Sequence, residues 1–268
     1  MTEPTNNGTL ARRSGFFHDL GTVALRALRL TARDPEAVGP GLIVPLFFLV
    51  VNIGSLQSFV ERGFPEGFDF KAFQLPVALV FAVTGISRAG ALVIDIQDGY
   101  LDRLLLTPIR RPTLLLGLMV ADFAVVCVMA VPVVILGLFL GITYETGVIG
   151  AVVFVLLGGL WGLAFTGFPY AIALKTGNPT AVNNAFLLFF PFAFLTTAYV
   201  PQQALTGWLS TVADYNPTTY LLDALRSLIY GGWDAAAIAK GFAAVALIGA
   251  ISFSLAFTAL RGRVSRSK

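Results

Sequence analysis

The chain alternates long apolar runs with short polar connections. Six runs of about 20 residues or more are almost free of charge, and each is long enough to cross the hydrocarbon of a membrane as a helix. They predict an all-α membrane protein with six transmembrane helices, at residues 38–58, 74–95, 113–140, 147–173, 181–200 and 236–260. The third and fourth are longer than a perpendicular span requires, so we expect them to tilt or to extend beyond the hydrocarbon.

Residues 16–34 carry a different pattern, with apolar side chains spaced three and four apart and arginines at other angles. This spacing is typical of an amphipathic helix that lies in the membrane interface. Proline disfavours helix in the residue before it, so the helix should end at Asp34-Pro35. The residues that define its two faces are Phe16, Phe17, Leu20, Arg26 and Arg29.

The segment 201–235 is too polar to span a membrane fully and too apolar for a free loop. It holds two stretches of helical character on either side of Asn216-Pro217, and Asn before Pro is a good helix cap. We therefore expect two outward-facing re-entrant half-helices that dip into one leaflet before the last span. Arg226 on the second would face the outer leaflet and bind lipid headgroups or cap an exit, or else pair with an aspartate of its own chain, Asp223 or Asp214.

The chain thus divides into four parts. These are a disordered polar tail at 1–15, the interfacial helix at 16–34, one transmembrane domain at 35–260 and a basic tail at 261–268.

Composition supports a membrane protein, because 56% of the residues are hydrophobic and only 12% are charged. A soluble domain carries roughly 25% charged residues. A single Cys and a single His exclude an internal disulfide and a Cys- or His-based metal site. The formal net charge of +3 is small, and we expect membrane lipids rather than nucleic acid as partners.

Lys and Arg are distributed unequally between the two sides. With six spans, both termini share a side that carries thirteen of them, whereas the opposite side carries four and Arg88 lies within a span. The positive-inside rule then places both termini, the segment 95–112 and the basic tail in the cytoplasm.

That segment has a leucine stripe and charges of both signs. On a helix, Leu101, Leu104, Leu105 and Pro108 share one side. Leucines rimmed by charge suit a groove on a soluble partner. The alternative is a solvated turn whose leucines rest on the bilayer.

The stretch Asp98-Gly-Tyr-Leu-Asp-Arg-Leu-Leu-Leu-Thr-Pro108 resembles the acidic–Gly–Thr–Leu–Glu–x–Leu–Leu–x–Thr–Pro segment of ABC-2 type transporter permeases. A second stretch, Asn216–Arg226 followed by Gly231-Gly232, is similar to the Asn-Pro…Arg…Gly signature before their last span. The resemblance covers residues 16–260 and is closest to the daunorubicin-resistance-like branch. Tyr100 stands where Thr is common, and Asp98 and Asp102 stand where Glu is frequent.

The resemblance implies a non-catalytic half-transporter. It would pair with a second permease chain, identical or different, and the pair would bind two copies of an ABC ATPase. The chain has no Gly-x-x-x-x-Gly-Lys-[Ser/Thr] phosphate loop, so no cofactor is expected on it, and ATP and Mg²⁺ would belong to the ATPase. The expected cargo is a hydrophobic drug-like or lipid-like compound exported across the bacterial inner membrane. The docking helix would be formed by Asp98, Gly99, Leu101, Asp102, Arg103, Leu104, Leu105, Thr107 and Pro108.

Arg88 and Asp122 are the charges that lie well inside predicted spans. Charges inside a membrane are costly and are candidates for function. We hypothesise a structural ion pair between them, the alternative being that Arg88 snorkels to the headgroups. A proton relay through Asp122 would instead make the chain an ion- or proton-coupled secondary transporter, the second functional hypothesis.

The fifth predicted span is rich in phenylalanine. Such a surface suits a hydrophobic cargo, and it equally suits lipid or the partner permease. The candidate substrate or dimer residues are Phe186, Phe189, Phe190 and Phe194.

Overall fold

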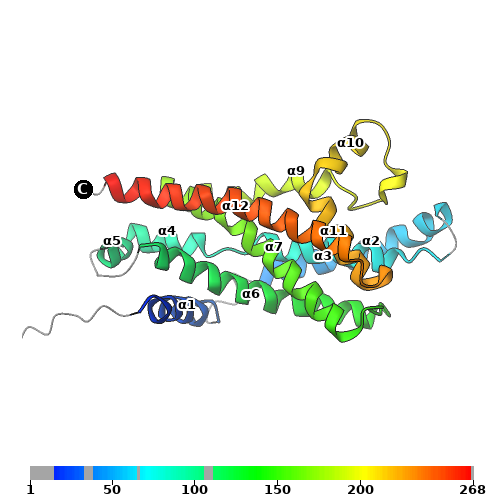
Figure 1. Ribbon diagram of the computed structural model, residues 1–268, viewed down its shortest axis with the longest axis horizontal. Helices are drawn as coiled ribbons and strands as arrows, with labels where there is room; N and C mark the ends of the chain where they lie inside the picture. Colours follow the sequence, from blue (N-terminus) through cyan, green and yellow to red (C-terminus); the bar gives the residue numbers. More distant parts are fainter. Residues whose placement is uncertain (1–14, 33–38, 65–66, 106–110, 267–268) are drawn as a thin grey trace, which may run out of the picture.

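The computed structural model describes residues 15–32, 39–64, 67–105 and 111–266, and every regular element in these ranges is a helix. Figure 1 shows an elongated bundle. Helix α5 and the C-terminal end of α12 lie at one end, which we call the α5 end. Helix α10 and the connection between α6 and α7 lie at the other, the α10 end.

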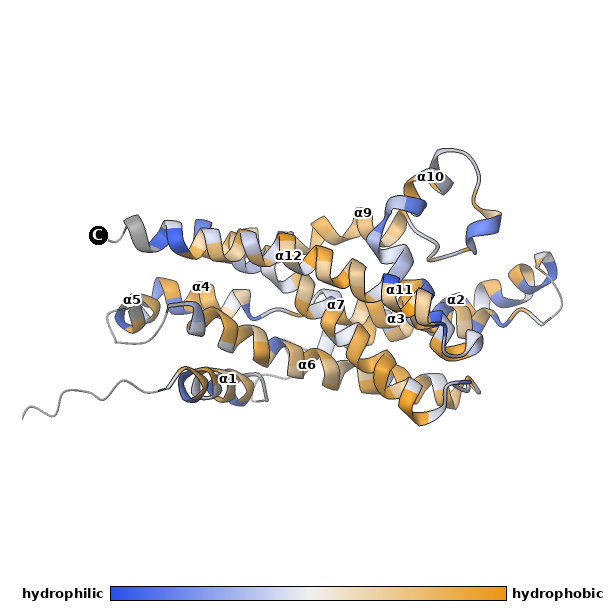
Figure 2. Ribbon diagram, viewed as in Figure 1, coloured by the Kyte–Doolittle hydropathy of each residue, from blue (hydrophilic) through white to orange (hydrophobic). Residues whose placement is uncertain are grey.

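Within these described ranges, five helical segments are long and apolar enough to cross a membrane, α3 and α4 together counting as one. Their middle portions are hydrophobic and their polar residues gather toward the two ends of the bundle (Figure 2). The chain is therefore a multi-pass membrane protein. The segments are α2 (Gly39–Gly63), α3 (Phe70–Thr84) with α4 (Ala89–Gln97), α6 (Arg111–Phe139), α7 (Gly147–Thr176) and α12 (Ala235–Arg266).

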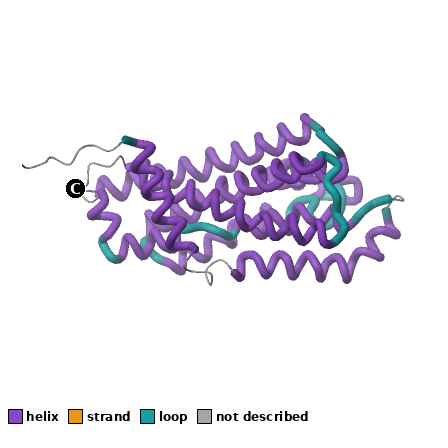
Figure 3. Tube along the Cα trace, turned by 90° about the horizontal axis from the view of Figure 1, so that it is seen from below, coloured by secondary structure: helices purple, strands orange, loops and turns teal. Residues whose placement is uncertain are grey.

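Shorter helices complete the bundle. Helix α1 lies across the bundle axis near the α5 end (Figure 3). The short elements are α1 (Phe16–Ala32), α5 (Tyr100–Leu105), α8 (Pro179–Asn184), η2 (Ala185–Leu188), α9 (Phe189–Phe194), η3 (Gln202–Ala204), α10 (Trp208–Tyr215), α11 (Pro217–Arg226) and the π-helical turn η4 (Ser227–Gly231).

The structure supports five of the six predicted spans. Instead of one helix at 181–200, it has a shorter apolar helical run, Pro179–Phe194, built from α8, η2 and α9. Pro191 has no N–H to donate to Leu187, and its ring crowds that carbonyl. The turn before it is wound as a 3-10 helix. At about 1.5 Å per residue the run is shorter than the roughly 30 Å hydrocarbon, so the six-span count is not confirmed.

The predicted span 74–95 is also interrupted. Helix α3 ends at Thr84 and α4 begins at Ala89, which leaves residues 85–88 outside either helix. Backbone that is not helical at membrane depth needs partners from the protein itself. We call residues 85–88 the break. Neighbouring helices must supply hydrogen bonds to its backbone.

Side-chain caps fix several helix starts. Asp69 accepts hydrogen bonds from the N–H groups of Lys71 and Ala72 at the start of α3. Asn178 caps α8, and Asn216 caps α11 by accepting from Thr218 N at 3.0 Å. The predicted role of Asn216-Pro217 as the start of the second short helix is confirmed.

Helix α7 runs through the middle of the bundle and packs closely on α12. A Cβ atom added to Gly167 would lie 2.6 Å from the carbonyl oxygen of Ser252, and the Ser252 hydroxyl donates to the carbonyl of Ala164. One cluster of buried apolar residues surrounds Trp161, and a second surrounds Tyr170 closer to the α5 end. Helix α7 thus packs closely on α12 and also contacts α3 and α4, which flank the break.

Candidate functional site

The α5 end carries the first candidate site, where α4 turns into α5. Gly99 has a φ of +69°, in the left-handed region that favours glycine. Its N–H donates to the carbonyl of Ile96 at 3.2 Å, and its own carbonyl accepts from Arg103 N at 3.2 Å. One glycine thus ends α4 and starts α5, which sets the direction of the short helix.

Helix α5 does not present all its leucines outward. The Leu101 side chain is 3% exposed and packs in the cluster around Tyr170, and the half-buried Leu104 packs against that cluster. Asp98 and Arg103 are exposed. The side chains of Asp102 and Leu105, and residues Thr107 and Pro108, fall outside what the structure describes. Leu101 therefore anchors α5 to the bundle, whereas the charged residues are available to a partner.

Helix α1 is attached to this turn through Arg26. Its Nη2 atom lies 3.3 Å from Asp95 Oδ1 of α4, and its guanidinium carbon lies 4.3 Å from the ring centroid of Tyr100 on α5. We call these three residues the Arg26 clasp. Tyr100, one of the residues that depart from the family motif, thus contacts α1.

Helix α1 also packs on α6. A Cβ atom on Gly117 would lie 2.7 Å from Val23 and 3.3 Å from the carbonyl of Leu20, so the glycine permits close approach. Phe17 is 83% exposed, Phe16 is partly exposed and Arg29 is exposed. This distribution agrees with an amphipathic helix that has one face on the bundle.

The second candidate site surrounds the break between α3 and α4. The Asp122 carboxylate of α6 is fully buried and accepts two hydrogen bonds. One comes from the backbone N–H of Arg88 at 3.1 Å and the other from the Tyr170 hydroxyl at 2.6 Å. Asp122 thus joins the start of α4 to α6 and α7.

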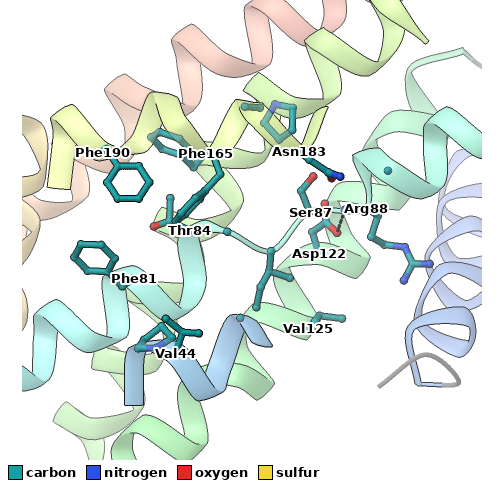
Figure 4. Close-up of a pocket in the computed structure, with 18 of the residues that line it drawn as sticks. Val44, Phe81, Thr84, Ser87, Arg88, Asp122, Val125, Phe165, Asn183 and Phe190 are labelled. Carbon is teal, nitrogen blue, oxygen red and sulfur yellow. Dashed lines mark hydrogen bonds between the residues drawn. The ribbon is translucent and has the colours of Figure 1, made fainter. Parts of the chain in front are cut away.

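The structure brings Arg88 and Asp122 together, but through the Arg88 backbone. Among the ion pairs closer than 4.0 Å in the described part of the chain, none joins their side chains. Figure 4 shows the Arg88 side chain pointing away from the carboxylate. Its Nε and Nη1 atoms are buried and have no hydrogen-bond partner among the described residues. Leaving such donors unsatisfied costs about 1–3 kcal/mol each.

A cavity of about 1290 Å³ opens beside the break. Figure 4 shows aromatic side chains on one side of it, and Ser87, Arg88 and Asn183 on the other. The lining comes from α1, α2, α3, α4, α6, α7 and the α8–α9 run. A cavity of this size is larger than the roughly 300–1,000 Å³ of typical small-molecule sites.

Three of the four phenylalanines predicted for a substrate or dimer surface line this cavity, namely Phe186, Phe190 and Phe194. Phe190 stacks on Phe194 at 5.6 Å and meets Phe186 edge to face at 5.3 Å. Phe189 is completely buried in the core. The aromatic wall is therefore made by one face of the α8–α9 run.

Arg226 does not face lipid. It is 4% exposed and donates to the hydroxyl and the carbonyl of Thr197, both at 2.8 Å, while its guanidinium lies 3.6 Å from the Phe73 ring centroid. It also lies 3.6 Å from Asp223 Oδ1, so the intrachain pairing is the alternative that the structure shows. Burial lowers the pKa of Arg226 to about 10, which leaves it charged at neutral pH.

Sequence reasoning singled out Arg88 but missed Tyr170 and the break in the helix around Arg88. Gly85, Ser87 and Arg88 interrupt an otherwise apolar run, and that interruption is the signal that could have revealed the break. Tyr170 gave no such signal, because a tyrosine in an apolar helix commonly packs without a role. In the described ranges, no group of three or more His, Cys, Asp or Glu residues could hold a metal ion.

Comparison with known proteins gives consistent matches. Residues 18–230 match the family described as ABC-2 type transporter. The chain is 27% identical over 252 residues to the daunorubicin resistance ABC transporter permease protein DrrB1 of Streptomyces coeruleorubidus, covering 91% of this chain and 84% of the relative. It is 26% identical over 213 residues to the probable doxorubicin resistance ABC transporter permease protein DrrC of Mycobacterium tuberculosis H37Rv, covering 77% and 75%. It is 27% identical over 219 residues to the putative transport permease ycf38 of Cyanophora paradoxa, covering 80% and 74%.

Proposed function

Because the chain belongs to the ABC-2 type transporter family, we propose that it is the permease subunit of an exporter driven by a separate ABC ATPase. It moves a hydrophobic drug-like or lipid-like compound out across the bacterial inner membrane. Two permease chains form the pathway, and two ATPase subunits bind ATP and Mg²⁺. Two of the relatives are named for resistance to daunorubicin and doxorubicin, which supports the drug-like cargo.

The observation that carries this proposal is the construction of the α5 end. Leu101 is buried while Asp98 and Arg103 are exposed, so α5 is held firmly and still offers charge to a soluble partner. Helix α1 is bound to the same turn through the Arg26 clasp. A helix that is anchored on both sides can transmit movement of an ATPase to α4 and to the break.

The membrane arrangement follows from charge and from the fold. The side with thirteen Lys and Arg is the cytoplasmic one, and the C-terminus lies at the same end of the bundle as α1 and α5 (Figure 1). The Pro179–Phe194 run acts as the sixth membrane segment. Helices α10 and α11 form the re-entrant pair on the outer side.

Transport requires that the cavity bind cargo differently in two states, since a ligand shifts an equilibrium only through unequal affinity. Helix α4 connects the docking turn to the break that lines the cavity. Closure of the ATPase dimer therefore changes the cavity through α4. The aromatic wall provides the apolar contact that a hydrophobic cargo needs.

Co-expression with the genes that neighbour its own, followed by purification and identification of any ABC ATPase retained, tests the proposal. We expect the purified permease to retain the ATPase, and Arg103→Glu to lose it while remaining in the membrane. Arg62→Glu is the matched control, because Arg62 is exposed at the far end of α2. The proposal fails if no ATPase is retained by the unmodified chain, or if the control loses it equally.

A further inference from the structure

The cavity beside the break has two chemically different sides. Phe81, Phe165, Phe190 and their neighbours form the aromatic side, and Ser87, Arg88 and Asn183 form the polar side (Figure 4). Val44, Phe48 and Ile94 also line it, and their side chains are 50%, 57% and 58% exposed. The cavity therefore adjoins the apolar outer surface of the bundle, where lipid would lie.

The charges of the polar side are not equally available. Asp122 is fully buried, and each of its oxygens already accepts a hydrogen bond. Asp95 is paired with Arg26 at 3.3 Å. Arg88 is the remaining charged residue of the lining, and its Nε and Nη1 atoms have no acceptor among the described residues. Within the described lining, the group that Arg88 lacks is therefore an anionic acceptor.

The Arg88 side chain points toward α1, the violet-blue helix at the right edge of Figure 4. Leu30 and Thr31 at the end of α1 line the same cavity. The guanidinium thus lies toward the α5 end of the cavity. An amphiphile in the cytoplasmic leaflet holds its head toward that end and its apolar part toward the membrane centre. The cavity lining has its polar side toward the α5 end and its aromatic side away from it, which matches this orientation.

We propose that the cavity binds an amphiphile with an anionic head, a phosphate or a carboxylate, which Arg88 holds while the phenylalanine wall contacts its apolar part. A guanidinium forms strong charge-assisted hydrogen bonds with both acids. Ser87 and Asn183 add neutral polar contacts. This inference rests on the proposed function and names the class of its cargo.

Binding can be measured on the full chain in phosphatidylcholine nanodiscs without ATPase or ATP. The chain has three tryptophans, so Trp208→Phe and Trp233→Phe leave Trp161 as the single reporter. Its indole donates to Thr84 at 3.1 Å, and Thr84 lines the cavity. The probes are dodecyl phosphate, dodecanoate, dodecanol and dodecyltrimethylammonium, which share one apolar chain, with empty nanodiscs as the partition control.

We expect the two acids to bind about 10-fold tighter than the neutral and cationic probes, since one charge-assisted contact distinguishes them. Arg88→Gln should remove that preference and leave dodecanol binding unchanged, whereas Arg88→Lys should keep part of it. Arg62→Gln, outside the cavity, should leave all four affinities unchanged. The inference is overturned if Arg88→Gln weakens all four probes equally or none of them. Failure to retain the ATPase would contradict the proposed function without altering these affinities, so the two failures are distinguishable.

Discussion

Asp122 accepts a 3.1 Å hydrogen bond from the backbone N–H of Arg88, at the point where α4 begins. An N–H at a helix start has no partner within the helix, and negative charge is favoured there. The carboxylate therefore acts as a cap supplied by another helix. Because the Tyr170 hydroxyl donates to the same carboxylate at 2.6 Å, three helices meet at one buried group.

This relationship makes Asp122 more important for stability than the Arg88 side chain. Asp122→Ala leaves a buried N–H and a buried hydroxyl unpaired, and each costs about 1–3 kcal/mol. Asp122→Asn should cost less, since its amide can accept from the N–H and donate to Tyr170. Thermal unfolding in detergent should rank Asp122→Ala below Asp122→Asn, with Arg88→Ala least affected.

Exchanging the two charges tests whether Asp122 caps the backbone of Arg88 or forms an ion pair with its side chain. Exchanging the residues, Arg88→Asp with Asp122→Arg, should not restore the stability lost in Asp122→Arg, because the observed contact uses the backbone of residue 88. Recovery in the double variant would contradict the backbone cap.

The Arg26 clasp should hold α5 in place. An exposed cation–π contact contributes about 0.5–1 kcal/mol, and an exposed ion pair about 0.2–1 kcal/mol. Arg26→Ala should therefore speed hydrogen exchange of the α5 amides by about 3- to 30-fold, the factor that the two energies together give. Arg29→Ala on the same helix is the control and should leave α5 exchange unchanged. Equal acceleration by both variants would mean that α1 acts on α5 only through its general packing.

The buried anchor of α5 and its proposed contact with the ATPase predict different consequences of mutation. Leu101 is 3% exposed within the cluster around Tyr170, so Leu101→Ala should cost about 2–5 kcal/mol of stability. Arg103 is exposed, so Arg103→Glu should leave thermal unfolding unchanged and weaken ATPase binding. A stability loss in Arg103→Glu, or none in Leu101→Ala, would reverse the assignment of anchor and contact.

Much of this fold follows from hydrophobic pattern. The four uninterrupted spans and the Asn216 cap depend on local signals, namely length, apolar content and a capping residue before proline. The break at 85–88 and the shorter run at Pro179–Phe194 depend on which polar groups neighbouring helices supply, and hydropathy averages over these details.

The site residues also divide into those that local sequence signals predict and those whose contacts depend on neighbouring helices. The pairing of Arg88 with Asp122 was predicted because both charges lie well inside predicted spans, yet that position alone cannot say whether a backbone or a side chain makes the contact. A helical wheel does not determine whether Leu101 faces the bundle or a soluble partner, because either one can bury a leucine. Tyr170 was missed since its partner, Asp122, lies 48 positions away in sequence.

Arg226 should be essential for the α10 end of the bundle. Its guanidinium donates two hydrogen bonds to Thr197 and lies on the Phe73 ring. Arg226→Ala therefore removes the hydrogen-bond donors of Thr197 and the cation beside Asp223. Losing one member of a buried charged network costs about 3–5 kcal/mol. Asp223→Asn should cost about 1 kcal/mol or less, because its side chain is 52% exposed and the pair is 3.6 Å long. Unfolding midpoints that fall equally in both variants would contradict this ranking.

The approach of α7 to α3 and α6 should depend on Gly162. A Cβ atom there would lie 2.8 Å from Val126 Cγ1 and 2.8 Å from the carbonyl oxygen of Val83. The backbone carbonyl cannot rotate away as a side chain can, so Gly162→Ala should lower stability by about 1–3 kcal/mol through overpacking. Gly54 of α2 has no atom within 4 Å of such a Cβ, and Gly54→Ala should be neutral or raise stability by up to about 1 kcal/mol. Unfolding midpoints measured in the same detergent compare the two, and a loss of similar size in both would mean that helix flexibility, rather than close packing, requires glycine at these positions.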